Sequence, residues 1–314
     1  MKTLVTGGAG FIGSNIVRLL LEKGHEVTVI DNLSSGYRCN LTPFPEVHFI
    51  DGDVRNMDAV NQAVEGAEVI FHLAASVGNM RSIEHPIEDS EINVIGTLQI
   101  LEAARQHKVR KVIFSSSAGI FGELKTLPIR EDHPVEPDSP YGASKLGAEK
   151  LCLAYNKLYN LEVVCLRYFN VYGVNQRYDA YGNVIPIFAH RMLHELPVVI
   201  FGDGEQTRDF ANVHDVAQAN YKAALTDGVS GAFNIGSSTR ITINHLVELM
   251  QDASGIKPVV EYGPPRKGDV RDSLADISAA RNAFGYEPVV GLEEGLTEYM
   301  AWAKHEMVRQ SCES

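Results

Sequence analysis

The sequence predicts an α/β protein in which a doubly wound parallel sheet is followed by a smaller α/β domain. Short apolar runs alternate with segments of helical spacing over the first 168 of its 314 residues. The apolar runs are continuous rather than interrupted by polar residues, which is typical of parallel strands covered by helices on both faces. After Gly173 this alternation ends and turn-forming residues become frequent, which indicates a change of domain.

The first elements form a βαβ unit of about thirty residues, with strand 2–6, helix 11–23 and strand 25–30. The same pattern continues to residue 168. Strands are expected at 47–50, 68–73, 111–115 and 162–168, and helices at 57–64, 91–106 and 141–158. These elements define a first domain over residues 1–172.

Residues 173–314 are expected to form mainly a second, smaller domain. It has a loop at 175–183, a helix at 185–193 and turns at 202–206 and 263–268. Residues 233–235 form a further strand, within a segment near 210–236, that is expected to return to the large sheet. The smaller domain would cover the carboxyl edge of the sheet, and the cleft between the two would hold a substrate.

Charge and composition exclude several classes of partner. The chain has 28 Lys and Arg against 40 Asp and Glu, a net charge of −12, which argues against nucleic acid and anionic membranes. No apolar run approaches the roughly 18 residues that cross a bilayer, and residues 1–11 are too short and glycine-rich for a signal peptide. The four cysteines show no metal-ligand spacing, so we expect reduced thiols, no metal site and a cytoplasmic protein.

Three glycines, Gly7, Gly10 and Gly13, come directly after the first strand and open the first helix. Without a Cβ they let the backbone approach a pyrophosphate, whose charge the helix N-terminus favours. The spacing is GxxGxxG and not the usual GxGxxG of dinucleotide-binding, Rossmann-like domains. A tight β–α turn without a ligand is the alternative.

Asp31 closes the second strand. A carboxylate there accepts both ribose hydroxyls of an adenosine and repels a 2′-phosphate, which favours NAD over NADP. A solvated strand-end carboxylate is the alternative. Asp53 ends the next strand and could reach the adenine, although Asp-Gly turn chemistry explains it equally well.

Tyr141 and Lys145 lie four residues apart on a predicted helix and therefore on one face. A phenol with a pKa of about 10 becomes a base near neutral pH only if a neighbouring charge stabilises its anion. Ser139 and Pro140 begin this helix, and the strand end at 115–117 brings Ser117 near the phenol. Together Ser117, Tyr141 and Lys145 would remove a proton from an alcohol as a hydride leaves its carbon. Taken alone, Ser117 fits a turn or capping role better.

The motifs TGGAGFIGS, HLAA at 72–75, Asn93-Val94, SSS followed by FG, YGASK and RYFNVYG resemble the extended short-chain dehydrogenase/reductase family. Within it the chain is similar to UDP-sugar 4-epimerases, almost end to end. The resemblance implies a bound NAD, Tyr141 as base, Lys145 on the nicotinamide ribose and Ser117 on the sugar C4 oxygen. The cofactor contacts that it implies are Gly7, Gly10, Phe11, Ile12, Gly13, Asp31, Asn32, Asp53, Val54, Leu73, Ala74, Ala75, Asn93, Ser115, Tyr141, Lys145 and Tyr168.

The segment 117–122 departs from the pattern of dehydratases and decarboxylases in this family, which carry an acidic residue there. The absence of that acidic residue from segment 117–122 favours epimerisation. Phe121 also replaces the tyrosine that is more usual before Gly122, an apolar exchange that we expect to be tolerated.

Arginines in the second half offer bidentate donors for a diphosphate. Arg208, Arg266 and Arg271 are the candidates, and a solvated surface arginine is the alternative for each. The resemblance places Arg208 and Arg266 on the UDP diphosphate, Phe201 near uracil and Asp269 on the ribose. The substrate contacts that it implies are Ser117, Tyr141, Asn170, Asn183, Val199, Phe201, Arg208, Arg266, Asp269 and Ser273. His214 and Asp215 are assigned to domain packing.

Substrate choice depends on Ser273, which is small where family members restricted to non-acetylated hexoses carry a tyrosine. We therefore expect UDP-GlcNAc and UDP-GalNAc as substrates, with UDP-Glc and UDP-Gal as further candidates. A UDP-glucuronate 4-epimerase, a nucleotide-sugar 4-reductase or dehydratase, and a non-enzymatic NAD-binding redox sensor are the alternatives. The family also implies a homodimer built on helices 91–106 and 141–158.

Overall fold

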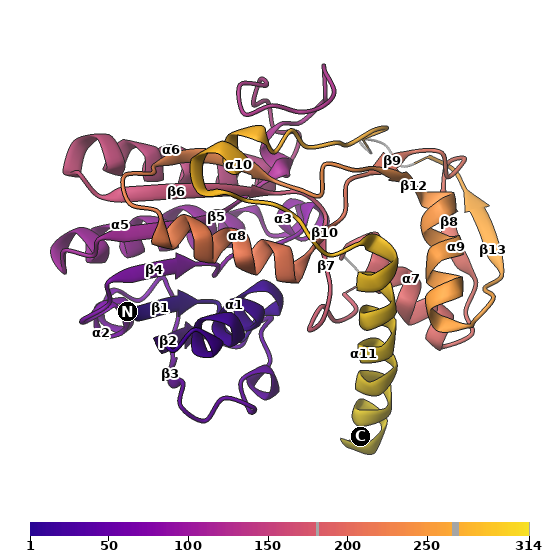
Figure 1. The fold of residues 1–314 in the computed structure, drawn as a ribbon, viewed down its shortest axis with the longest axis horizontal. Coiled ribbons are helices and arrows are strands. Elements are labelled where there is room, and N and C mark those ends of the chain that lie inside the picture. Colours follow the sequence, from indigo (N-terminus) through magenta and orange to yellow (C-terminus); the bar gives the residue numbers. More distant parts are fainter. Residues whose placement is uncertain (180–181, 266–269, 314) are drawn as a thin grey trace.

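A computed structural model describes residues 1–179, 182–265 and 270–313. Its centre is a seven-stranded sheet of order β11-β6-β5-β4-β1-β2-β3, in which every neighbouring pair is parallel (Figure 1). The strands are β1 (Lys2–Thr6), β2 (Glu26–Asp31), β3 (His48–Asp51), β4 (Val69–His72), β5 (Lys111–Ser117), β6 (Glu162–Tyr168) and β11 (Gly231–Ile235). Because all seven run the same way, their carboxyl ends meet at one edge.

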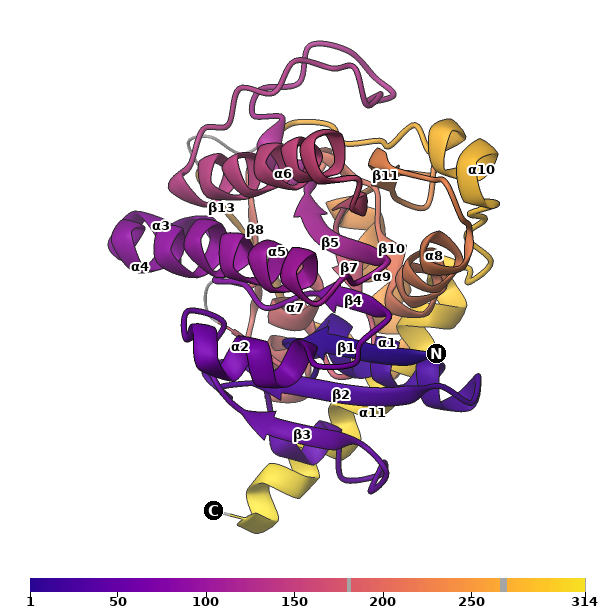
Figure 2. The same ribbon diagram turned by 90° about the vertical axis from the view of Figure 1, so that its left-hand side faces the viewer.

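Helices cover both faces of this sheet, as Figure 2 shows. One face carries α1 (Phe11–Glu22) and α8 (Val213–Leu225), and the other carries α2 (Met57–Val64), α5 (Thr97–Gln106) and α6 (Pro140–Tyr159). Shorter pieces are η1 (Arg38–Asn40), α3 (Asn79–Glu84), α4 (Pro86–Ser90), η2 (Glu91–Gly96), η3 (Ala118–Ile120) and α10 (Ser278–Phe284).

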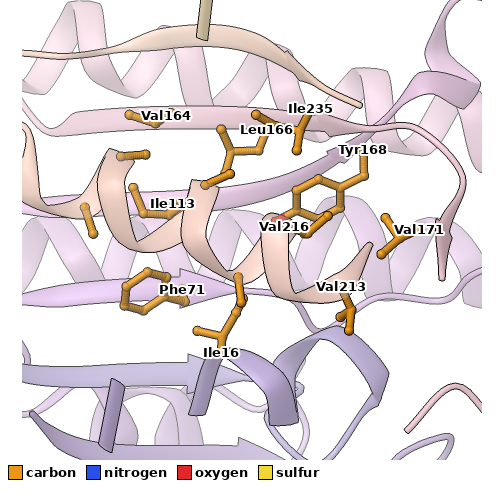
Figure 3. Close-up of a cluster of buried hydrophobic side chains, with 14 of the residues drawn as sticks. Ile16, Phe71, Ile113, Val164, Leu166, Tyr168, Val171, Val213, Val216 and Ile235 are labelled. Carbon is orange, nitrogen blue, oxygen red and sulfur yellow. The ribbon is translucent and has the colours of Figure 1, made fainter. Parts of the chain in front are cut away.

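Successive residues of each buried strand point to opposite faces, so the sheet supplies two cores. Val5 and Phe71 belong to the core beneath α1 and α8, whereas Leu4 and Ile70 belong to the core beneath α5 and α6. Figure 3 shows the first of these cores, in which Val216 of α8 lies over the sheet. Both faces of every central strand are therefore buried, which explains the continuous apolar runs in the sequence.

The C-terminal half forms a third core beside the carboxyl edge of the sheet. It contains α7 (Val184–Leu193), α9 (Ile243–Ser254) and α11 (Leu292–Glu313). Three small sheets complete it: β7 (Val171–Tyr172) with β10 (Ala211–Asn212), β8 (Val198–Phe201) with β13 (Val260–Gly263), and β9 (Thr207–Arg208) with β12 (Ile241–Thr242). Among the described residues, no helix is both long and apolar enough to cross a membrane.

The predicted fold class is confirmed: the chain has a doubly wound parallel sheet with smaller C-terminal sheets. The helix predicted at 91–106 is present, although its first part, Glu91–Gly96, is a π-helix that continues into α5. Two short helices before it, α3 and α4, were missed. They have only six and five residues, and their apolar side chains Met80, Ile83 and Ile87 are exposed rather than packed on a core, so they gave no signal of a core-facing helix.

Candidate active site

The glycine turn between β1 and α1 is closed by backbone contacts that only glycine permits. Gly7 has a φ of +68°, and a Cβ there would lie 2.8 Å from the backbone nitrogen of Ala74. A Cβ on Gly13 would lie 2.1 Å from the carbonyl oxygen of Gly7. Gly10 precedes α1 without a side-chain cap, and the first turn of α1, where Phe11 and Ile12 lie, holds no acidic residue. The N-terminus of α1 is therefore suited to an anion.

Asp31 ends β2 beside this turn and is only 8% exposed. Its Oδ2 accepts a hydrogen bond from the Ala9 nitrogen at 2.9 Å, and its Oδ1 accepts one from the Leu33 nitrogen at 2.8 Å. Burial raises the pKa of Asp31, and these two amide hydrogen bonds oppose that rise. The carboxylate is thus held in one orientation at the strand end where the sequence predicts the adenosine ribose.

Asp53 is already engaged by a neighbouring arginine. Arg55 donates from Nε to Oδ1 at 3.0 Å and from Nη2 to Oδ2 at 2.7 Å, and Asn32 donates to Oδ2 at 2.9 Å. The Arg55 hydrogen bonds lower the pKa of Asp53 to about 2. Val54 packs against Gly96, where a Cβ would lie 2.8 Å from its Cγ2. This local network accounts for Asp53 within the turn, and its contact with an adenine stays a prediction.

The segment after β4 is fixed to β1 by Thr6. The hydroxyl of Thr6 accepts hydrogen bonds from the nitrogens of Leu73 and Ala74, both at 3.1 Å. The backbone that leads to Ala75 is thereby placed directly against Gly7, at the edge where a cofactor would cross the sheet.

Tyr141 and Ser117 both lie beside Gly119. A Cβ on Gly119 would be 3.3 Å from Ser117 Oγ and 3.5 Å from Tyr141 Cε1. Burial raises the pKa of Tyr141, and its hydrogen bond with Ser117 opposes that rise. Ser139 caps α6 by accepting a hydrogen bond from the Gly142 nitrogen at 3.1 Å, which fixes where the helix begins and hence where the phenol lies.

Lys145 is 3% exposed, one turn along α6 from Tyr141. Its Nζ lies 4.5 Å from the centre of the Phe114 ring, and none of the ion pairs among the described residues includes it. Burial lowers the pKa of Lys145 to about 8. A buried ammonium without a paired carboxylate is suited to hold hydroxyl oxygens such as those of a ribose.

Asn93, a predicted cofactor contact, has all of its amide used within the protein. Its Oδ1 accepts from the Ser76 nitrogen at 2.9 Å, while its Nδ2 donates to the Ser76 carbonyl, to Asp89 and to Ser144. Ser144, between Tyr141 and Lys145 in sequence, donates to Asp89 Oδ2 at 2.5 Å. Asp89 and Ser144 therefore anchor α6, the helix that carries Tyr141 and Lys145, a role that no spacing in the sequence indicated.

Across β5 and β6 the register partner of Tyr168 is Ser117, whereas that of Ser115 is Leu166. The Tyr168 side chain enters the core under α8, where Ser115 is among its hydrogen-bond partners. The Tyr168 hydroxyl donates to Asn220 Oδ1 at 3.0 Å and accepts from Asn220 Nδ2 at 2.8 Å. Burial raises the pKa of this phenol. Its side chain is therefore committed to packing, which leaves its predicted cofactor contact without support from the side chain.

Several predicted substrate residues meet around residues 206–209. Asn170 donates to the Asp209 carbonyl at 3.0 Å, and the Ser273 nitrogen donates to the Thr207 carbonyl at 3.2 Å. Arg208 belongs to β9 in this segment. The Phe201 carbonyl accepts from Gln206 Nε2 at 2.9 Å, which joins the end of β8 to the same region.

Of the remaining predicted substrate residues, Arg271 adjoins this cluster, because its carbonyl accepts from the Thr207 nitrogen at 3.0 Å. Val199 lies within β8, and Asn183 precedes α7 without making a side-chain cap. Arg271 is held by Asp203 through two hydrogen bonds of 2.7 and 3.1 Å, so its charge is already paired. Arg266 and Asp269 lie outside the described residues.

His214 and Asp215 hold the two halves of the chain together. His214 contacts Arg18 of α1 and Glu298 of α11, and Asp215 accepts hydrogen bonds from the nitrogens of Val289 and Val290. These contacts support their assignment to packing. Over the described ranges, no group of three or more His, Cys, Asp or Glu side chains is placed to hold a metal ion.

The model of the NAD dependent epimerase/dehydratase family matches residues 3–236. The UDP-glucose 4-epimerase of Mycolicibacterium smegmatis is 39% identical over 303 residues, which cover 95% of this chain and 97% of that protein. The crystal structure of a Thermotoga maritima UDP-glucose 4-epimerase with UDP-glucose matches with a TM-score of 0.92 and 40% identity, covering 98% and 100% of the two chains.

A second solved structure is similar to the same degree in shape. The UDP-N-acetylglucosamine 4-epimerase of Methanobrevibacter ruminantium, in complex with UDP-N-acetylmuramic acid, has a TM-score of 0.92 and 36% identity and covers 98% of each chain. The glycine cradle, the oriented Asp31 carboxylate and the unpaired Lys145 ammonium fit NAD. The chain belongs to the NAD dependent epimerase/dehydratase family, and its cofactor is NAD.

Proposed function

We propose that UDP-GlcNAc and UDP-GalNAc are the substrates of this NAD-dependent nucleotide-sugar 4-epimerase, with UDP-Glc and UDP-Gal as slower ones. The size of Ser273 carries the proposal: it is a small, buried residue whose nitrogen donates to the Thr207 carbonyl, at the position where the family resemblance implies a tyrosine in enzymes restricted to non-acetylated hexoses. Among the relatives, one structure contains UDP-glucose and another protein is named for UDP-N-acetylglucosamine. They support a UDP-sugar without separating the two.

We propose for these side chains the catalytic roles that the family resemblance implies. Tyr141 takes the proton from the sugar C4 hydroxyl, Ser117 hydrogen-bonds the same oxygen, and the Lys145 ammonium stabilises the phenolate. NAD, when bound, supplies a hydride acceptor that later returns the hydride to the opposite face of the sugar. The sequence 117–122 places no carboxylate beside the C4 oxygen, which supports epimerisation over elimination of water.

The substrate is tested by Ser273→Tyr, assayed separately on UDP-GlcNAc and UDP-Glc with the epimers resolved by chromatography. The proposal expects kcat/KM for the acetylated sugar to fall by about 10- to 100-fold relative to the plain sugar, because the added ring removes the acetyl pocket. Ser278→Tyr, on the exposed start of α10, is the matched control and should leave the ratio unchanged. An unchanged ratio in Ser273→Tyr contradicts the pocket assignment.

The same assay with UDP-glucuronate tests the second candidate substrate. If UDP-glucuronate is converted faster than UDP-GlcNAc, the protein is a UDP-glucuronate 4-epimerase and our proposal is wrong. A 4-reductase would instead consume NADH in proportion to product. A redox sensor would bind NAD and leave all three sugars unconverted.

We also propose a homodimer formed through α5 and α6, which lie side by side on one face of the sheet (Figure 2). Ile95 of η2, which leads into α5, and Leu158 and Tyr159 of α6 are apolar and exposed. A light-scattering mass of a single chain would contradict the dimer. A cytoplasmic location stays a prediction from the sequence.

A further inference from the structure

Arg177 joins three parts of the chain that lie far apart in sequence. It belongs to the loop that follows β7. Its Nη1 donates to Asn40 Oδ1 at 2.9 Å, and its Nε donates to Glu306 Oε1 of α11 at 2.7 Å. Its guanidinium carbon lies 4.1 Å from the centre of the Tyr37 ring. Figure 1 shows α11 running from the C-terminal half down beside the N-terminal strands, and this contact fixes it there.

The ion pair at this junction is shielded from water. The side chains of Arg177 and Glu306 are 8% and 10% exposed, unlike the surface pairs of the molecule such as Arg281–Glu287. Trp302 lies 5.7 Å from the guanidinium carbon on the other side. A charge-assisted pair of this kind holds its geometry far better than an exposed one, because neither partner can exchange freely with water.

The junction reaches the cofactor turn through Asn40. Asn40 Nδ2 donates to the Ala9 carbonyl at 2.8 Å, and the Tyr37 nitrogen donates to the same oxygen at 3.0 Å. The Ala9 nitrogen in turn donates to Asp31 Oδ2. Arg177 therefore orients Asn40, Asn40 holds the carbonyl of Ala9, and the nitrogen of the same residue orients the carboxylate expected at the adenosine ribose.

We propose that Arg177 is a positioning residue for the cofactor, which clamps segment 37–40 and the C-terminal helix onto the glycine turn and so slows the release of NAD. An epimerase ends each cycle with its cofactor in the starting oxidation state, so exchange of NAD serves no step of the reaction. A clamp formed by the C-terminal half would keep NAD bound from one cycle to the next. The inference concerns the bound cofactor and does not depend on which sugar is the substrate.

The test measures the release of NAD without any sugar. Protein loaded with NAD⁺ is mixed with excess alcohol dehydrogenase and ethanol, which reduce each NAD⁺ as it is released, and NADH absorbance is followed. We expect Arg177→Met to release NAD about tenfold faster or more, because a charged hydrogen bond to Asn40 is lost. Arg281→Met, which removes an exposed arginine of α10, is the control and should release NAD at the wild-type rate.

Two further variants distinguish a positioning role of Arg177 from a general effect on the stability of the protein. Asn40→Ala leaves the Arg177–Glu306 pair intact but cuts the connection to Ala9, so it also carries the test if Arg177→Met fails to fold. Arg177→Lys can keep the pair with Glu306 but cannot reach Asn40 at the same time, and should release NAD at an intermediate rate. Since the residues act in series, the double variant should release NAD no faster than the faster single variant.

The proposal is overturned if Asn40→Ala releases NAD within about twofold of the wild-type rate, or if the two single effects multiply in the double variant. A lower melting temperature of cofactor-free Arg177→Met with an unchanged release rate also overturns it, because that result assigns Arg177 to stability alone.

Discussion

Glu149 and Arg167 form a buried two-point ion pair between α6 and β6. Arg167 donates from Nη2 to Oε1 at 2.7 Å and from Nε to Oε2 at 3.1 Å, and Ser116 donates to Oε2 at 2.6 Å. The two side chains are 0% and 5% exposed. Glu149 lies one turn beyond Lys145, so this pair fixes α6 to β5 and β6.

Removing one partner of this pair should destabilise the protein strongly. Glu149→Gln leaves the Arg167 charge buried and unpaired, and we expect the free energy of unfolding to fall by about 3–5 kcal/mol. Urea unfolding followed by circular dichroism measures it. Glu287→Gln, which breaks the exposed pair with Arg281, should cost less than about 1 kcal/mol. Equal losses in the two variants would show that the burial of Glu149 contributes nothing.

Replacing the Tyr141 hydroxyl should remove catalysis and leave the fold intact. Tyr141→Phe is expected to lower kcat/KM by about 10²- to 10⁴-fold, because the oxygen that we propose takes the proton is removed. NAD content and melting temperature should match the wild type. Tyr155→Phe lies on the same helix, where its hydroxyl donates to Glu102, and serves as control. Full activity of Tyr141→Phe would reject Tyr141 as the base.

Asp31 should determine both the affinity for NAD and the discrimination against NADP. In Asp31→Ser the charged acceptor of the ribose hydroxyls is lost, and we expect the Kd for NAD to rise about 10- to 100-fold. The Kd for NADP should rise less or fall, since repulsion of a 2′-phosphate is relieved. Titration calorimetry on cofactor-stripped protein measures both. Asp51→Asn, at the end of the neighbouring strand, should change neither.

The stability of the protein should fall in mild acid because of His72. Burial lowers the pKa of this imidazole to about 3, and its ring nitrogens contact the hydroxyls of Thr6 and Thr97. Between pH 3 and about 6.5 the unfolded chain binds the proton and the folded one does not, so stability rises with pH in this window. At pH 5 the contribution of His72 is lower than at neutral pH by about 2 kcal/mol.

Unfolding by urea at pH 5 and pH 7 tests this contribution. His72→Gln should show a smaller loss of stability on acidification than the wild type, even if it is less stable at both values. His107→Gln, at an exposed position, should lose as much as the wild type. An unchanged loss in His72→Gln would assign the acid sensitivity to other groups.

Much of this architecture was accessible from periodicity and turn chemistry, because buried parallel strands and glycine turns have local signals. Gly7, Gly13, Asp31 and Ser139 could be interpreted from their neighbours in sequence alone. Contacts between distant segments have no such signal. Asp89 and Ser144 meet only because α4 packs on α6, and Arg177 meets Glu306 across more than a hundred residues.

The engagement of Asp53 by Arg55 shows a different limit. The two residues are neighbours in sequence, yet spacing alone could not decide whether the carboxylate faces a ligand or its own turn. The same holds for Tyr168, where the pattern RYFNVYG suggested a cofactor contact and packing under α8 commits the hydroxyl to Asn220.

The last strand of the large sheet has a consequence for engineering. Because β11 and α8 come from the second half of the chain, a fragment ending at residue 172 would lack both. Strand β6 would then be an unpaired edge strand, and the apolar face of the sheet that α8 covers would be exposed. Such a fragment is expected to aggregate. Chimeras that graft a new sugar specificity onto this scaffold therefore need several crossover points, with 210–236 inherited from the recipient rather than the donor.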